Sequence, residues 1–261
     1  DLLPPIMIGF AFNNVLPAHL GDLVRVFLFA RKQGVTQSAA LSSVVLERVF
    51  DIIAVLIILG GGLLFVPNLD PSVHKTAMVF AGISAVFLTG AIAFVIWTGP
   101  FVWLFEAVLA RVPMLPAGLR KKLTGMLEAG AAGMASLKQP RLLTGILASS
   151  LAQWLLNAGL VHLSLWSFDI HVSPAVSCLV VGITAFGVTV PSSPGYFGVI
   201  QLCFMTVLKV FVDDQPAVFA ASVYYHLSQY IPVTLIGLTY FSFSGVRMRE
   251  VNAAADAGSI G

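Results

Sequence analysis

The sequence predicts an all-α, polytopic integral membrane protein, arranged as an inverted repeat with two re-entrant helical hairpins. Hydrophobic residues make up 58% of the 261 residues and charged residues only 10%, whereas a soluble domain carries about 25% charged residues. Two Pro-x-x-x-Gly segments, at Pro17/Gly21 and Pro191/Gly195, each interrupt an apolar run. Paired helix breaks at corresponding places of two halves are typical of membrane transport folds.

The first repeat, residues 1–100, is predicted to contain a re-entrant hairpin at 3–32 followed by two spans at 38–66 and 74–98. The two pieces of the hairpin are too short to cross a bilayer, which needs about 20 apolar residues. The proline at Pro17 removes a backbone donor, and irregular backbone exposed to lipid is not tolerated. We therefore expect the rest of the protein to shield this hairpin.

The second repeat, residues 141–250, is predicted to repeat these parts in a different order. A span at 141–167 comes first, then a re-entrant hairpin at 173–211, then a span at 216–245. The break in this hairpin carries two prolines, and a second short helix is expected to begin at Tyr196.

Residues 101–140 differ in character from both repeats. They combine an amphipathic piece with a basic, small-residue-rich piece, which predicts a cytoplasmic interfacial linker between the repeats. The tail at 251–261 is small and polar and is predicted to be disordered. The chain opens on Asp1 rather than Met, which indicates a fragment and leaves open a preceding membrane helix.

The positions of the basic residues predict the orientation. Lys75 and Lys209 fall on one side of the predicted spans. Ten basic residues fall on the other: Arg31, Lys32, Arg111, Arg120, Lys121, Lys122, Lys138, Arg141, Arg247 and Arg249. By the positive-inside rule this bias predicts a multi-pass protein of the cell inner (cytoplasmic) membrane with a cytoplasmic C-terminus. The first hairpin then enters from the cytoplasmic side and the second from the outer side, so the halves are inverted.

A weak internal echo agrees with this repeat. Aligning Gln37 with Gln215 sets Arg48 opposite His226, provided that the second half carries four extra residues. The two long helices that follow the hairpins are therefore predicted to correspond.

Three ionisable side chains lie inside one predicted span, at Glu47, Arg48 and Asp51. Each costs at least about 2.5–3.5 kcal/mol to insert in ionised form. Arg48 is three residues before Asp51 and can bridge to it. One interpretation is an ion cluster that only fixes helix packing; the other is the charged wall of a cavity.

Asp22 and Arg25 lie at the start of the short helix that follows Pro17. Exposed backbone donors at a helix start favour an anionic group, and Arg25 can hold a phosphate through two hydrogen bonds. The alternative is that Arg25 only pairs with Asp22 or extends to the interface. Asn14 and His19 are adjacent polar candidates that can also serve simply as caps of the hairpin.

The second hairpin offers hydroxyls, free carbonyls and a polar helix start, and polar groups of the last span are expected to face it. The candidates are Ser192, Ser193, Gly195, Gln201, Tyr225 and His226. Satisfied helix contacts are the alternative for the histidine, and packing is the alternative for the aromatic side chains. Gln153, Asn157 and His162 mark a polar face on the preceding span, for which hydrogen bonding between helices is the alternative.

Several classes of function lack support. The net charge of +2 is too small to indicate a nucleic-acid partner. Cys178 and Cys203 both fall in apolar segments, which argues against a disulfide framework. There is no His-x-x-x-His pair, no Gly-x-Ser-x-Gly and no phosphate loop. We therefore predict that the chain is not an enzyme and takes no metal or cofactor.

Three motifs carry a family resemblance. They are Asn14-x-x-Pro17-Ala18-x-x-Gly21-Asp22-x-x-Arg25, Leu46-Glu47-Arg48-x-x-Asp51 and Pro191-x-Ser193-Pro194-Gly195-x-x-Gly198. In this order they resemble the lysylphosphatidylglycerol synthase transmembrane-region family, which includes the flippase domain of the bacterial multiple-peptide-resistance factor. The resemblance covers nearly the whole chain and implies a lipid-translocating domain. It implies roles for Asn14, Pro17, Arg25, Glu47, Arg48, Asp51, Pro191, Pro194 and Gly195.

Two features depart from the family pattern. Gln201 stands where the flippase domain typically has a glutamate, and the chain contains no soluble aminoacyl-transferase domain. Synthesis of the lysyl lipid is therefore not expected of this chain.

The function expected is translocation of a polar-headed lipid between leaflets through a cavity near the membrane midplane. Arg25, Arg48 and the short-helix ends would bind the headgroup, while Glu47 and Asp51 hold the arginines or contact a cationic headgroup. A non-transporting membrane partner of polyprenyl-linked glycan or lipid synthesis is the alternative, and an intramembrane lipid-modifying enzyme is the third. The partners expected are the lipid substrate and the bilayer, with a homo-oligomer left open.

Overall fold

The computed structural model of the chain is helical in every continuous segment that it describes. These segments are residues 2–16, 20–66, 140–189 and 193–244, with isolated positions between 71 and 107. No strand occurs among the described residues. The all-α prediction is therefore confirmed.

Three predicted segments fall largely beyond this description. The span at 74–98 and the linker at 101–140 are described only at isolated positions, and the tail at 251–261 lies outside the described residues.

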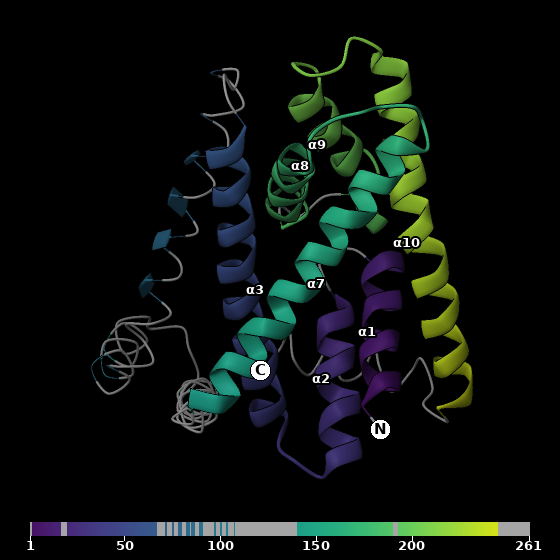
Figure 1. Ribbon diagram of the computed structural model, residues 1–261. Coiled ribbons are helices and arrows are strands. Elements are labelled where there is room, and N and C mark those ends of the chain that lie inside the picture. Colours follow the sequence, from purple (N-terminus) through teal and green to yellow (C-terminus); the bar gives the residue numbers. More distant parts are fainter. Residues whose placement is uncertain are drawn as a thin grey trace.

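Two short helices, α1 (Leu3–Val15) and α2 (Leu20–Gln33), begin the chain and pack side by side. Prolines stand in the first turn of α1. They are tolerated there because the N–H groups of the first turn have no acceptor within the helix. At 13 and 14 residues, each helix is about 20 Å long, which is less than the roughly 30 Å of a bilayer core. Both lie in the lower half of the view in Figure 1.

Backbone contact at Gly21 determines how closely α1 and α2 approach. A Cβ atom added there would lie 2.0 Å from the carbonyl oxygen of Gly9 and 2.5 Å from the backbone nitrogen of Asn13. Any side chain at Gly21 would push the helices apart, so the hairpin requires glycine at this position.

Two 29-residue helices, α3 (Gln37–Phe65) and α10 (Gln215–Phe243), run the length of the molecule. Each is about 44 Å long. Side chains cap both starts: Thr36 Oγ1 accepts from the Ala39 N–H at 3.2 Å, and Asp214 Oδ1 accepts from the Ala217 N–H at 3.0 Å. The two helices begin at the pair of glutamines that the predicted repeat aligns.

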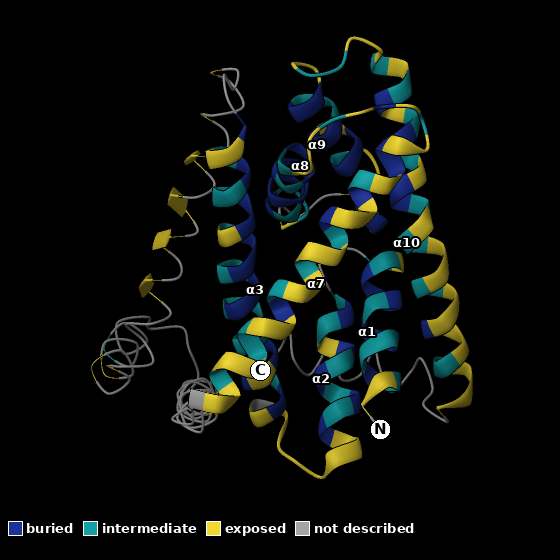
Figure 2. Ribbon diagram, in the orientation of Figure 1, coloured by how far each residue is buried: buried dark blue, intermediate teal, exposed yellow. Residues whose placement is uncertain are grey.

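A third long helix, α7 (Pro140–Trp166), crosses the molecule obliquely in Figure 1. Within the described residues, two helical segments are long and apolar enough to cross a membrane, Ala39–Phe65 in α3 and Arg141–Trp166 in α7. Figure 2 shows long exposed faces on α7 and α10. Exposed large apolar side chains on these faces include Leu156 and Leu235, as expected where a helix faces lipid.

The second pair of short helices is α8 (Pro174–Gly187) and α9 (Val199–Leu208), joined through the 3₁₀ turn η2 (Pro194–Tyr196). They lie in the upper half of Figure 1. The expected helix start at Tyr196 is wrong, because Gly195, Tyr196 and Gly198 have φ values of 67°, 62° and 90°. Positive φ cannot continue a right-handed helix, so α9 begins only after Gly198.

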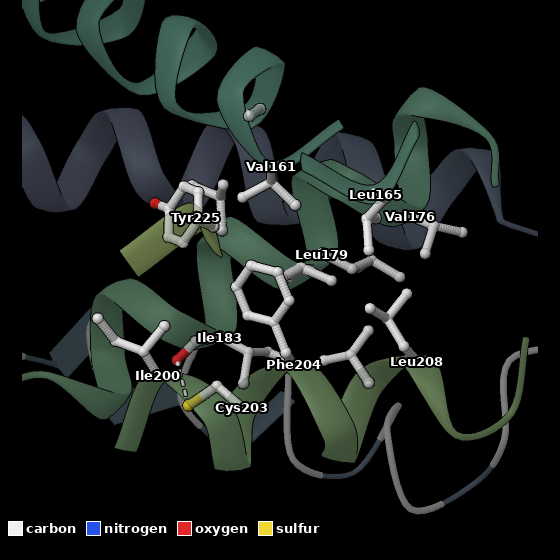
Figure 3. Packing of buried hydrophobic residues seen from close by; sticks show 14 of the residues in the cluster. Val161, Leu165, Val176, Leu179, Ile183, Ile200, Cys203, Phe204, Leu208 and Tyr225 are labelled. Carbon is white, nitrogen blue, oxygen red and sulfur yellow. Dashed lines mark hydrogen bonds between the residues drawn. The ribbon is translucent and has the colours of Figure 1, made fainter. Parts of the chain in front are cut away.

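The main core surrounds this second hairpin and joins α3, α7, α8, α9 and α10. Leu179 and Phe204 are fully buried in it, and the rings of Phe204 and Tyr225 lie 5.2 Å apart (Figure 3). A smaller cluster of Ile8, Phe12, Val24 and Leu28 joins α1 to α2. The second hairpin is thus the more deeply embedded of the two.

Each hairpin packs against the long helix of the other half. Helix α1 packs on α10, while α8 packs on α3, and α1 also contacts η2. The hairpins lie toward opposite ends of the molecule in Figure 1. Between them they enclose the middle of the structure.

Candidate functional site

A cavity of about 580 Å³ lies where the two hairpins meet the long helices. Every described helix contributes to its wall, so both halves of the chain are needed to form it. Six of the residues predicted from the sequence line it: Asn14, Asp22, Arg48, Asp51, Tyr225 and His226.

Arg48 and Asp22 form the ion pair at the centre of the charged wall. Arg48 Nη2 donates to Asp22 Oδ2 at 3.1 Å and to Oδ1 at 3.3 Å. Asn13 Nδ2 also donates to Asp22 Oδ1, at 2.9 Å. The carboxylate of α2 is therefore fixed by α1 on one side and by α3 on the other.

Asp51 lies on the far side of the same guanidinium. Its Oδ2 is 3.8 Å from Arg48 Nη1, and its Oδ1 accepts from the indole N–H of Trp154 at 3.3 Å. Ser150 also hydrogen-bonds to this carboxylate. These contacts tie α3 to α7 and bring Arg48 between two carboxylates.

Arg25 pairs with Glu47 of α3 rather than with Asp22 of its own helix. The pair is bidentate, with Arg25 Nη1 donating to Glu47 Oε1 at 3.0 Å and Nη2 donating to Oε2. Neither residue lines the cavity. Both donor groups of the fork are already used, so Arg25 does not offer them to a ligand in this conformation.

The charges of the two helices are arranged reciprocally. In α2 the acid Asp22 precedes the base Arg25, and in α3 the acid Glu47 precedes the base Arg48. Each acid pairs with the base of the other helix. With Asp51 added, two carboxylates and one guanidinium line the cavity, a formal charge of −1.

The opposite wall is neutral and is organised around Gln201. Gln201 Oε1 accepts from the Gly198 N–H at 2.8 Å, at the start of α9, and Nε2 lies 3.3 Å from His226 Nδ1. Because the amide nitrogen can only donate, Nδ1 acts as acceptor and the neutral imidazole carries its proton on Nε2. Gln201 is buried outside the cavity wall and orients His226, which lines it.

The C-terminal end of α1 touches the turn η2 of the second hairpin. A Cβ atom on Gly195 would lie 3.1 Å from the carbonyl oxygen of Asn14 and 2.7 Å from a ring carbon of Tyr230. Asn14 Nδ2 donates to Thr234 Oγ1 of α10 at 2.9 Å. Asn14 therefore connects the first hairpin both to the second hairpin and to the last helix.

Some predicted site residues lie elsewhere. Ser193 donates its hydroxyl to the carbonyl of Phe197 within the second hairpin, and neither Ser193 nor Gly195 lines the cavity. Pro17, His19 and Ser192 lie outside the described residues.

The cavity also contains residues that pattern alone did not single out as site residues. Trp154, Thr184 and Tyr196 line it. Trp154 could have been found from the sequence, because it lies next to Gln153 and near Asn157, the polar residues of the same helix that also line the cavity. The place of Tyr196 in the wall could not be predicted from the neighbouring residues, because the backbone at Tyr196 has a positive φ, which changes the direction of its side chain.

His162, predicted with that polar face, does not line the cavity and instead lies 3.0 Å from the hydroxyl of Ser177 through Nδ1. Within the described residues, no group of three or more His, Cys, Asp or Glu side chains is placed to hold a metal ion.

Comparison with known proteins gives two relatives of this chain. A UPF0104 membrane protein of Methanocaldococcus jannaschii is 21% identical over 232 residues, covering 88% of this chain and 92% of the relative. Glycosyltransferase AglD of Haloferax volcanii is 23% identical over 266 residues, covering 89% of this chain but 41% of the relative. No solved structure matches the chain.

The family comparison agrees with the motifs and with the helical fold. The model of the lysylphosphatidylglycerol synthase TM region matches residues 1–237, which include both hairpins and most of α10. The chain is therefore a membrane protein that belongs to the lysylphosphatidylglycerol synthase TM region family.

Proposed function

We propose that this chain moves a polar-headed lipid between the two leaflets of a membrane, through the cavity between its hairpins. The observation that carries the proposal is the cavity itself. It has a volume of about 580 Å³ and a charged wall of Asp22, Arg48 and Asp51 in the middle of an otherwise apolar helical protein. Burying a lipid headgroup without polar partners is costly, so a polar path lowers the barrier to crossing.

The arrangement of the hairpins supports a re-entrant, inverted-repeat interpretation. Helices α1 and α2 are each too short to span, lie toward one end and precede α3, while α8 and α9 lie toward the other end and precede α10. The packing of α1 on α10 mirrors the packing of α8 on α3. Folds of this kind place their substrate site at the interface between the repeats.

The charge distribution supports the proposed orientation. Arg31 and Lys32 lie in the last turn of α2, which joins α3 at the lower end of Figure 1, and α7 begins at that end near Arg141. We assign this end to the cytoplasm of a cell whose inner membrane holds the protein. Lipid then reaches the cavity past the first hairpin from the cytoplasmic leaflet.

The charge of the wall bears on the headgroup. Arg48 is shared by two carboxylates, and Arg25 is occupied by Glu47. The headgroup that this wall accommodates best brings hydrogen-bond donors for the carboxylates and an acceptor for Arg48, rather than negative charge alone. No covalent step is assigned to any residue of the site.

Leaflet exchange in proteoliposomes tests the proposal. The purified chain is reconstituted with headgroup-labelled lipids, and the label accessible from outside is followed with time. Exchange faster than in protein-free liposomes is expected, and Arg48→Ala is expected to slow it by about tenfold or more, the equivalent of one lost charged hydrogen bond. Lys32→Ala, at the exposed end of α2, is the matched control. Exchange no faster than in empty liposomes would refute the proposal.

The relative named glycosyltransferase AglD supports a second candidate. The match covers 41% of that protein, so a domain like this chain there forms part of a larger protein. A chain of this kind could then serve as a membrane partner in the synthesis of a lipid-linked glycan without moving lipid. Absence of exchange, together with stimulation of glycosyl transfer to a lipid acceptor, would favour this candidate.

A further inference from the structure

We propose that the cavity opens sideways into the bilayer through a lateral slot, which is rimmed by Gln153 of α7 and Gln229 of α10. The headgroup of the lipid passes along this slot and contacts the two glutamines, while the acyl chains stay in the membrane outside. The inference rests on the proposed function and deepens it, because it names the side of the protein on which the lipid meets the cavity.

Each of the three long helices carries a polar residue at its centre. Asp51 is the central residue of α3, Gln153 of α7 and Gln229 of α10. In helices of 27 and 29 residues, the centre is about 20 Å along the helix from either end, near the middle of a hydrocarbon core about 30 Å thick. All three side chains line the cavity. The cavity is therefore polar at the depth where a headgroup is most costly to bury.

Gln153 differs from the other two central residues because it is exposed at the surface of the protein, whereas Asp51 is buried and Gln229 is half-buried. Leu156 and Leu160 lie on the same face of α7 as Gln153 and are 71% and 42% exposed. A polar side chain among lipid-facing leucines is rare at this depth unless it borders a cavity. Because Gln153 is exposed and also lines the cavity, the cavity reaches the outer surface at this residue.

The side-chain amide of Gln153 is not used to hold the helices together. The backbone carbonyl of Gln153 accepts from Asn157 Nδ2 at 3.1 Å, but its side chain makes no hydrogen bond to any residue that the structure describes. A polar side chain that only joined two helices would be hydrogen-bonded across them. On the other rim, Gln229 hydrogen-bonds to the hydroxyl of Tyr225, which uses part of its capacity. Both amides can therefore donate to and accept from a passing headgroup.

The packing of α7 leaves one side of the cavity open. Helix α7 packs on α3, α8 and α10, while α1 packs on α2 and α10. Helices α7 and α1 both line the cavity, for example through Trp154 and Phe10, but they do not pack closely on each other. Figure 1 shows α7 leaning away from α1 towards its lower end. Among the described helices, the opening therefore lies between α7 and the pair formed by α1 and α10.

The surfaces on either side of the slot are suited to acyl chains. Leu156 and Leu160 are exposed on α7, and Ile231 and Leu235 are 48% and 60% exposed on α10. Acyl chains that lie along these faces keep apolar surroundings during the whole passage. Only the headgroup then needs polar partners, and Gln153 marks the point at which it leaves the lipid for the cavity.

Access of water to single positions of α7 tests the slot. Gln153→Cys and Leu156→Cys, on the same face of the helix, each receive a nitroxide label in a chain whose native cysteines are replaced by alanine. In phosphatidylcholine vesicles, power-saturation electron paramagnetic resonance measures collision of the label with a water-soluble nickel chelate and with oxygen, which concentrates in lipid. The label at position 153 is expected to collide with the nickel chelate severalfold more often than the label at position 156. Equal nickel access at the two positions would overturn the proposal.

Leaflet exchange supplies the second measurement. Gln153→Leu makes the outer face of α7 continuously apolar and removes one neutral hydrogen-bonding group, so exchange should slow by roughly two- to tenfold. Leu156→Ala is the matched control and should leave the rate unchanged. An unchanged rate in Gln153→Leu would also overturn the proposed route. Failure of exchange in the unmodified chain would refute the proposed function, whereas the nickel measurement would still decide whether the slot is open.

Discussion

The Arg25–Glu47 pair allows a quantitative test of how the first hairpin is held. Replacing Glu47 by glutamine removes the charge that balances Arg25, whose side chain is only 11% exposed. Loss of a partner from a buried pair costs about 3–5 kcal/mol. Glu47 is 34% exposed, so water reaches this pair, and we expect Glu47→Gln to lower the free energy of unfolding by about 2 kcal/mol.

The converse substitution should cost less. Arg25→Gln leaves behind the more exposed Glu47, which water can solvate, so the expected loss is about 1 kcal/mol. The double variant loses both charges and leaves neither unpaired. It should therefore be more stable than the sum of the two single losses predicts, by about 1–2 kcal/mol of coupling.

Equilibrium unfolding by sodium dodecyl sulfate in mixed micelles, followed by circular dichroism, measures these differences. Lys32→Gln, at the exposed C-terminal end of α2, controls for loss of a positive charge on the same helix. Additive single losses, with coupling below about 0.3 kcal/mol, would refute the reasoning. So would a larger loss in Arg25→Gln than in Glu47→Gln.

Three further substitutions test other contacts by the same unfolding assay. Gly21→Ala should force α1 and α2 apart and so lower the free energy of unfolding by at least about 3 kcal/mol. Gly159→Ala is its control, because an added Cβ there meets nothing within 4 Å; it should leave the free energy of unfolding unchanged or raise it by up to about 1 kcal/mol. Gln201→Ala removes the acceptor of the Gly198 N–H at 2.8 Å and should cost about 1 kcal/mol; an unchanged midpoint would mean that this cap is dispensable. Trp154→Phe keeps the ring but removes the donor to Asp51, with an expected loss of about 1.5 kcal/mol, and a loss as large as that of Trp154→Ala would instead indicate a packing role.

Much of the helical layout could be predicted from the sequence, because helix starts carry local chemistry. Thr36 and Asp214 are capping residues that stand directly before α3 and α10. A capping residue just before a long apolar segment indicates where a helix begins. Apolar length then distinguishes these long helices from the four short ones of the hairpins.

The ion pairing could not be predicted, because it depends on how one helix is rotated against another. Arg25 and Glu47 are 22 residues apart, and sequence spacing gives the faces of each helix but not which faces meet. The same limit applies to Trp154, whose indole reaches Asp51 across 103 residues. The late start of α9 was missed for a different reason: positive φ at Tyr196 is set by its surroundings and has no signature in the residue itself.

Each hairpin packs against the long helix of the other half, and this has a consequence for the order in which the fold can assemble during synthesis. Helix α1 is synthesised before every other described helix, yet the helix that it packs against, α10, is the last one described. Until α10 is synthesised, the face of α1 that carries Ile8 and Phe12 lacks Phe241, which lies 5.1 Å from Phe12 between ring centres. The first half therefore cannot complete its own packing until α10 has been synthesised and has entered the membrane.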